Sequence, residues 1–242
     1  MQRLITKASV LAAVFATSSV FASGHAGDIA NGKNIFMNGK GDVPACTSCH
    51  GQNAMGDDAM GTPRLSGQDF TYIYKQLEDF ATDKRADTTM YVMNANAKGL
   101  SDEDKRDVAA YVASLDYESL DSSDMNQVKE LGNPVGVRYL GKSIVMYGAV
   151  DRGVPACHSC HSFNGRGAAP MYPFIGGQKY VYLVNQLKKW RDGSRANDPQ
   201  GQMRAVAKNM TDEDIYNAAT FLTSAPRTTV GNTRVPPMRS EH

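Results

Sequence analysis

Two five-residue stretches decide how this chain is read: Cys46-Thr47-Ser48-Cys49-His50 and Cys157-His158-Ser159-Cys160-His161. Together they contain all four cysteines of the 242-residue sequence. Two thiols three residues apart can each form a thioether with one vinyl group of a haem, and the histidine that follows directly is placed to ligate the iron. The pattern predicts two covalently bound haem c groups. Their attachment points are Cys46, Cys49, Cys157 and Cys160, and their iron ligands are His50 and His161.

Two other uses of paired cysteines are weighed against haem attachment. A single structural zinc site would have to gather cysteine pairs that lie 111 residues apart, far outside the usual spacing of zinc ligands. A redox-active pair of the thioredoxin type requires a strand that leads into the motif within an α/β fold. No alternating strand pattern of useful length occurs in the sequence. His158, inside the second motif, is interpreted as a variable surface residue.

The two motifs occupy equivalent places in an internal repeat. Sliding the chain along itself by about 110 residues aligns Gly32-Lys33 with Gly141-Lys142, and further matches continue through each unit. The matched pairs include Pro63 and Pro173, Gln68 and Gln178, Tyr72 and Tyr182, Gln76 and Gln186, Arg85 and Arg195, and Met93 and Met203. Matches spread over the whole unit indicate two copies of one domain.

The sequence of each unit predicts short helices separated by loops. Apolar residues recur near helical spacing over 70–80 and 180–190. Ser101 and Thr211, each followed by Asp-Glu-Asp, are suited to cap a further helix. The sequence therefore predicts an all-α fold with two tandem domains. Three or four short helices enclose little core, so a large apolar prosthetic group is expected to complete each interior.

The sequence divides into five expected segments. The stretch after residue 115 is rich in Ser, Asp, Glu and Asn and is interpreted as a linker. The final residues, with three prolines and scattered arginines, are expected to be poorly ordered. The segments are a signal peptide at 1–22, an N-terminal haem c domain at 23–115, the linker at 116–135, a C-terminal haem c domain at 136–224 and a tail at 225–242.

The N-terminal residues predict export. Residues 1–22 carry Arg3 and Lys7, then an apolar run, then small residues up to Ala22, which is the pattern of a secretory signal peptide. Ala26 is an alternative cleavage site. The apolar run is shorter than the roughly 20 residues needed to span a bilayer, so a retained membrane anchor is disfavoured. We expect an exported mature protein with at most peripheral membrane association.

Charge and composition narrow the classes of partner. The sequence has 26 Lys and Arg against 25 Asp and Glu, a formal net charge of +1. No basic surplus marks it for nucleic acid. Hydrophobic residues make up 41% of the chain, an ordinary globular composition that excludes disorder throughout. Because the mature chain is nearly neutral, local charged patches must steer its redox partners.

The sixth iron ligand is sought by elimination. The other histidine of the first unit, His25, lies near the mature N-terminus, so two histidines on that iron are not expected. Methionine is the natural candidate. Met37 with Met146, and Met93 with Met203, are methionines in both units with matching neighbours, but the first pair precedes the cysteine motif, where packing is the simpler use. Met93 and Met203, expected in a loop before the last helix of each unit, are the predicted axial ligands.

The residues around these positions resemble cytochrome c4 over nearly all of 26–224. The resemblance is carried by Ala26-Gly27-Asp28, Leu65-Ser66-Gly67-Gln68 with Ile175-Gly176-Gly177-Gln178, the run from Trp190 to Asp198, and the placement of Met93 and Met203 eight residues before Ser101 and Thr211. Members of that family are periplasmic dihaem electron carriers. Two class I cytochrome c domains pack about a pseudo-twofold axis, each with a His-Met iron. The resemblance implies that the carbonyls of Pro63 and Pro173 orient the histidine ligands.

Four matched polar residues have two interpretations. Arg85 and Arg195 are candidates for pairing with haem propionates, because a buried carboxylate needs a charge partner. The alternative is that both are solvated surface charges. Tyr72 and Tyr182 could also donate to a propionate, but an aromatic residue at helical spacing is more often part of the core.

Two functions of different classes remain open. In the first, the protein is a one-electron carrier between a cytochrome bc-type quinol-oxidising complex and a haem-copper terminal oxidase, as the resemblance implies. In the second, it is a haem enzyme, such as a peroxidase, or the dedicated electron-accepting subunit of a periplasmic dehydrogenase, such as one acting on sulfur compounds. Enzyme chemistry at iron needs an open or displaceable sixth position. Since methionine is expected at both irons, the sequence favours the carrier and predicts no enzymatic activity.

Overall fold

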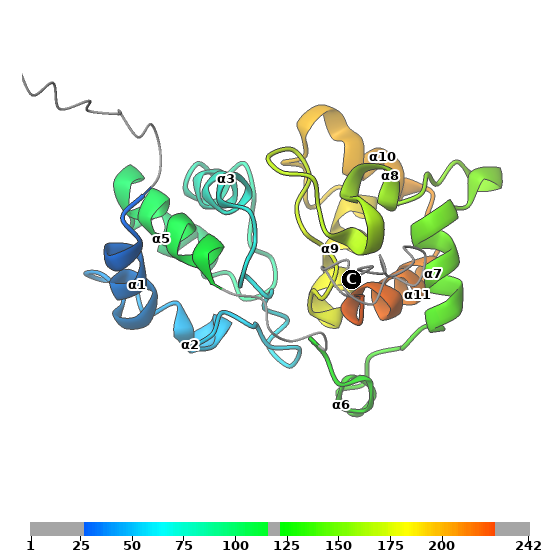
Figure 1. Cartoon of the computed structure of the whole chain (residues 1–242), viewed down its shortest axis with the longest axis horizontal. Coiled ribbons are helices and arrows are strands. Elements are labelled where there is room, and N and C mark those ends of the chain that lie inside the picture. Colours follow the sequence, from blue (N-terminus) through cyan, green and yellow to red (C-terminus); the bar gives the residue numbers. More distant parts are fainter. Residues whose placement is uncertain (1–26, 116–121, 226–242) are drawn as a thin grey trace, which may run out of the picture.

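The computed structural model describes residues 27–115 and 122–225, and these residues form two lobes of helices (Figure 1). Apart from isolated bridges such as Lys40 with Val43, the regular structure within these ranges is helical, which confirms the all-α prediction. The expected signal peptide, both candidate cleavage sites and all but the first residue of the expected tail lie outside the described residues.

Five helices build the first lobe, drawn from blue to green in Figure 1. They are α1 (Ile29–Asn38), α2 (Thr47–His50), α3 (Phe70–Ala81), α4 (Met93–Lys98) and α5 (Asp102–Ser114). The Asp28 carboxylate caps α1, since it accepts from the backbone N–H groups of its first turn. Ser101 and Asp104 form a capping box at the start of α5, which confirms the predicted cap.

The second lobe repeats this order. Its helices are α7 (Arg138–Tyr147), α8 (His158–His161), α9 (Tyr180–Asp192), α10 (Gln202–Lys208) and α11 (Asp212–Thr223). Three short 3-10 turns lie between them: η1 (Val150–Arg152), η2 (Phe163–Gly165) and η3 (Pro199–Gly201). Thr211 and Asp214 form the capping box of α11, as predicted. The internal repeat in the sequence is therefore a repeat of structure.

A glycine at each main helix crossing lets two backbones touch. In the first lobe α1 packs against α5, and a Cβ placed on Gly32 would lie 1.9 Å from the carbonyl oxygen of Asp107. In the second lobe α7 packs against α11, and a Cβ on Gly141 would lie 1.8 Å from the carbonyl oxygen of Asn217. Any side chain larger than hydrogen would push these helices apart.

Each lobe has its own apolar core. The first core includes Phe36, Val112 and Ala97, and the second includes Val145 and Ile215, all of which are fully buried or nearly so. Among residues 27–115 and 122–225, no helix is long and apolar enough to cross a membrane.

The expected linker is not irregular over its full length. The part of 116–135 that the structure describes contains a short helix, α6 (Met125–Glu130), which Asp124 caps. Val128 on this helix is completely buried in the core of the second lobe. The Oγ atom of Ser122 bonds the Thr223 hydroxyl at 2.7 Å. Residues 122–135 therefore pack as part of the second lobe, because the apolar residues of α6 face its core.

Candidate haem centres

One cavity of about 390 Å³ is lined by residues of both lobes and by both cysteine motifs. Its walls are formed mainly by apolar side chains, including Phe36, Leu77, Leu183 and Leu222. The four cysteines, all within the described residues, form no disulfide. The sulfur atoms of both motifs are thus available for bonds to a group held in the cavity.

The histidine of each motif is oriented by a proline carbonyl. His50 is the last residue of α2, and its Nδ1 atom lies 3.2 Å from the carbonyl oxygen of Pro63. His161 ends α8, and its Nδ1 lies 2.9 Å from the carbonyl oxygen of Pro173. Since a carbonyl oxygen can only accept, Nδ1 is the donor in each ring, and the Nε2 lone pair is left for a metal.

Burial sets the protonation of these groups. It lowers the pKa of His50 and of His161, which keeps both rings in the neutral form that binds iron. Burial also raises the pKa of Cys46 and of Cys157 to about 11. A redox-active cysteine pair works through a thiol whose pKa is lowered. The raised values and the all-helical surroundings both argue against the thioredoxin-type alternative.

The two predicted methionine ligands lie in corresponding places and both line the cavity. Met93 is the first residue of α4 and Met203 is the second residue of α10, so neither lies in the loop expected for it. The sequence analysis did not predict these two short helices, each of which lies ahead of the last helix of its lobe. Met37 and Met146 are not among the cavity-lining residues; Met146 is 5% exposed within the packed second lobe.

A carboxylate clamps the turn that precedes each of these methionines. Asp87 Oδ2 accepts from the backbone N–H of Val92 at 3.1 Å and of Met93 at 3.3 Å. Burial would raise the pKa of Asp87, but the backbone donors outweigh it and hold the pKa below its usual value. In the second lobe Asp198 accepts instead from the backbone N–H and Nε of Arg204, at 3.0 and 2.8 Å. The two turns are fixed by different partners.

Arg85 and Arg195 are buried between the lobes, so the interpretation as solvated surface charge is wrong. They are 7% and 5% exposed. Arg85 donates to the Tyr182 hydroxyl at 3.1 Å, and Arg195 donates to the Tyr72 hydroxyl at 3.2 Å, so each arginine reaches across to the other lobe. This reciprocity is the signature of a twofold-related interface. We call this set of contacts between the lobes the seam; Tyr72 and Tyr182 belong to it together with Arg85 and Arg195.

The buried guanidinium groups of Arg85 and Arg195 have polar, uncharged hydrogen-bond partners. Within the described residues, neither Arg85 nor Arg195 forms an ion pair with Asp or Glu, and their other partners are amide oxygens such as those of Gln76 and Gln186. Burial would raise the pKa of Tyr182, but the two guanidinium groups lower it to about 8. Both arginines line the cavity. Buried cations of this kind fit a ligand that brings its own carboxylates, as haem does.

Some residues of this site were not assigned a role from the sequence. Gln76 and Gln186 were found as matched positions of the repeat, but nothing in the sequence indicated that their amide oxygens would accept from both arginines. Asp87 and Asp198 do not align with each other, and the sequence analysis assigned neither of them a role. The repeat alignment was the one feature that could have marked the glutamines.

Comparisons with known proteins agree with this geometry. The cytochrome c family pattern matches residues 29–116 and 154–226, which hold one cysteine motif each. The cytochrome c4 of Pseudomonas aeruginosa is 32% identical over 186 residues, covering 76% of this chain and 85% of that protein. The chain belongs to the cytochrome c4-like family. This dihaem cytochrome has two cytochrome c domains, carries two covalently bound haem c groups and is an electron carrier.

Two further relatives carry a more specific description. A thiosulfate dehydrogenase electron acceptor of Stutzerimonas stutzeri is 33% identical to this dihaem cytochrome over 204 residues, covering 84% of this chain and 89% of that protein. The structure of thiosulfate dehydrogenase TsdBA from Marichromatium purpuratum matches with a TM-score of 0.73 at 28% identity. That match covers 82% of this chain and 40% of the other, so the chain spans less than half of the structure it resembles.

Proposed function

We propose that this dihaem cytochrome is the electron acceptor of a periplasmic dehydrogenase that oxidises thiosulfate. The observation that carries the proposal is the similarity, over most of both chains, to a thiosulfate dehydrogenase electron acceptor. The sequence alone favours a carrier between a quinol-oxidising complex and a terminal oxidase, and similarity to cytochrome c4 supports that second candidate. The acceptor role is preferred because the thiosulfate dehydrogenase electron acceptor covers 84% of this chain against 76% for the cytochrome c4, and the TM-score of 0.73 exceeds the 0.66 of a cytochrome c4 structure.

The same proposal assigns the iron ligands. His50 and Met93 hold the first iron, and His161 and Met203 hold the second; all four side chains line the one cavity that contains both cysteine motifs. Haem supplies an iron that accepts or releases one electron. A ligand set that stays in place in both oxidation states keeps structural change small, which suits electron transfer and disfavours an enzymatic haem. The protein is thus proposed to have no catalytic activity of its own.

Four further residues are proposed to position the haems and their histidine ligands. Arg85 and Arg195 are proposed to pair with haem propionates, whose negative charges would balance the two buried guanidinium groups. The carbonyls of Pro63 and Pro173 keep the histidine rings in one orientation and one tautomer. The expected signal peptide at 1–22 would deliver the chain to the periplasm, where the dehydrogenase is proposed to act.

A reconstitution experiment tests the proposed donor. The oxidised protein is mixed with thiosulfate and a purified thiosulfate dehydrogenase, and haem reduction is followed by stopped-flow absorbance. We expect rapid, thiosulfate-dependent reduction of both haems. Reduction by a quinol-oxidising cytochrome complex with quinol is expected to be much slower at equal concentration. Omitting either thiosulfate or dehydrogenase is the control. Fast reduction by the quinol-oxidising complex, with none by the dehydrogenase, would restore the other carrier role.

A further inference from the structure

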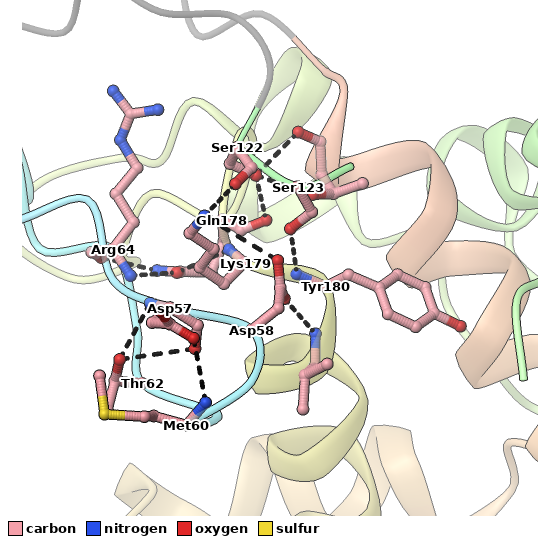
Figure 2. Close-up of polar contacts among 12 residues, drawn as sticks. Asp57, Asp58, Met60, Thr62, Arg64, Ser122, Ser123, Gln178, Lys179 and Tyr180 are labelled. Carbon is pink, nitrogen blue, oxygen red and sulfur yellow. Dashed lines mark hydrogen bonds and ion pairs between the residues drawn. The ribbon is translucent and has the colours of Figure 1, made fainter. Parts of the chain in front are cut away.

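A glutamine of the second lobe holds the peptide group that orients the histidine of the first lobe. Gln178, 4% exposed, accepts through Oε1 from the backbone N–H of Arg64 at 2.7 Å (Figure 2). Its Nε2 atom donates to the carbonyl oxygen of Arg64 at 2.9 Å. The N–H of Arg64 and the carbonyl of Pro63 belong to one planar peptide unit. One rigid group therefore bonds Gln178 on one edge and His50 on the other.

The reciprocal arrangement holds the histidine of the second lobe. Gln68, in the first lobe and 3% exposed, accepts from the backbone N–H of Phe174 at 2.9 Å and donates to its carbonyl oxygen at 2.8 Å. The N–H of Phe174 shares a peptide plane with the carbonyl of Pro173, which accepts from His161. Each lobe thus reaches the proximal ligand of the other through one side chain and one peptide group.

We infer that Gln178 and Gln68 are positioning residues that set the iron ligand of the opposite domain. Gln178 is well placed for this because its Oε1 also accepts from the backbone N–H of Lys179 at 2.8 Å, directly before α9. Gln68 is fixed in the same way by the N–H of Asp69 at 3.1 Å, directly before α3. A hydrogen bond to one edge of a peptide polarises the group and strengthens the bond at the other edge.

A competing explanation is that each loop holds its own proline. The N–H of Leu65 donates to the carbonyl oxygen of Ala54 at 2.7 Å, and Thr62 Oγ1 donates to the carbonyl oxygen of Cys49 at 2.7 Å. If these contacts within the lobe suffice, then removing Gln178 has no effect on the first haem. The two explanations differ in which haem responds, which an experiment can resolve.

The test is a crossed pair of substitutions in the holoprotein, Gln178→Met and Gln68→Met, which keep side-chain length and remove both hydrogen bonds. Two quantities are measured for each haem: its midpoint potential, and the proton NMR shifts of its histidine ligand. The haems are assigned by NMR contacts to Val112 in the first lobe and Leu222 in the second, both of which line the cavity. Far-ultraviolet circular dichroism and small-angle scattering check the fold and the compact two-domain shape.

We expect Q178M to raise the potential of the first haem and leave the second unchanged, and Q68M to do the reverse. A weaker bond from His50 Nδ1 to the Pro63 carbonyl makes the ring less basic, so it stabilises ferric iron less. No shift, a shift in the haem of the substituted residue's own domain, or equal shifts of both haems in a compact protein would overturn the inference. If Q178M does not fold, the shorter Gln178→Asn is judged by the same criteria.

Discussion

Replacing Met93 with Ala should open only the first haem iron to carbon monoxide, and replacing Met203 with Ala should open only the second. Each of these side chains lines the cavity that both cysteine motifs share, and each is held there by a carboxylate-clamped turn. With both thioethers in place, an external ligand must first displace one of them, so the unmodified reduced protein should bind carbon monoxide poorly near neutral pH. Each variant should also lower the potential of its own haem, since loss of methionine removes stabilisation of ferrous iron.

Carbon monoxide titration of the reduced proteins, followed by visible absorbance, measures this effect. Met90→Ala and Met171→Ala are the matched controls, because both residues line the cavity but are 37% and 70% exposed. The controls should bind no more carbon monoxide than the unmodified protein. Ready binding by the unmodified protein at a full haem equivalent would contradict the two-methionine assignment and shift weight to an enzymatic haem.

Replacing Gly32 or Gly141 with Ala should cause a large loss of folding stability, although the substitution adds only one methyl group and no charge. The added methyl would lie within 2 Å of a backbone carbonyl oxygen of the facing helix, 1.9 Å at Gly32 and 1.8 Å at Gly141. Overpacking a side chain costs about 1–3 kcal/mol, and a clash with backbone cannot be relieved by a rotamer change. We therefore expect a loss of about 3 kcal/mol or more for each variant.

Denaturant unfolding of the holoprotein, followed by circular dichroism, measures the loss. Lys33→Ala and Lys142→Ala are the matched controls, since each lies next to its glycine on the exposed face of the same helix. The controls should change the free energy of unfolding by less than about 0.5 kcal/mol. Glycine variants as stable as their controls would show that the helices can separate at little cost, contrary to the close crossing of α1 with α5 and α7 with α11.

Together, the seam contacts make the interface between the lobes part of both haem sites. Arg85 and Arg195 reach across it to tyrosines, and Gln68 and Gln178 reach across it to the peptide groups of the prolines that orient the histidines. In the proposed arrangement, the geometry of each haem depends on the domain that holds the other.

The sequence by itself determined the local features of this protein. Haem attachment follows from cysteines three residues apart with an adjacent histidine, a spacing that one helical turn brings together as α2 and α8. The caps at Ser101 and Thr211 and the helices α3 and α9 likewise depend on neighbours within a few residues. Such contacts are encoded by spacing along the chain, so pattern and periodicity suffice to predict them.

Only the tertiary structure decided which residues meet across the seam. Gln178 and Arg64 are 114 residues apart, and Arg195 and Tyr72 are 123 apart, so their contact depends on how the two lobes pack. The repeat showed that Gln178, Arg195 and Tyr72 each have an equivalent in the other unit, but it did not show which residue each one contacts. The helix α6 was missed for the same reason. Val128 packs into the core of the second lobe, which is formed by residues distant from it in the sequence.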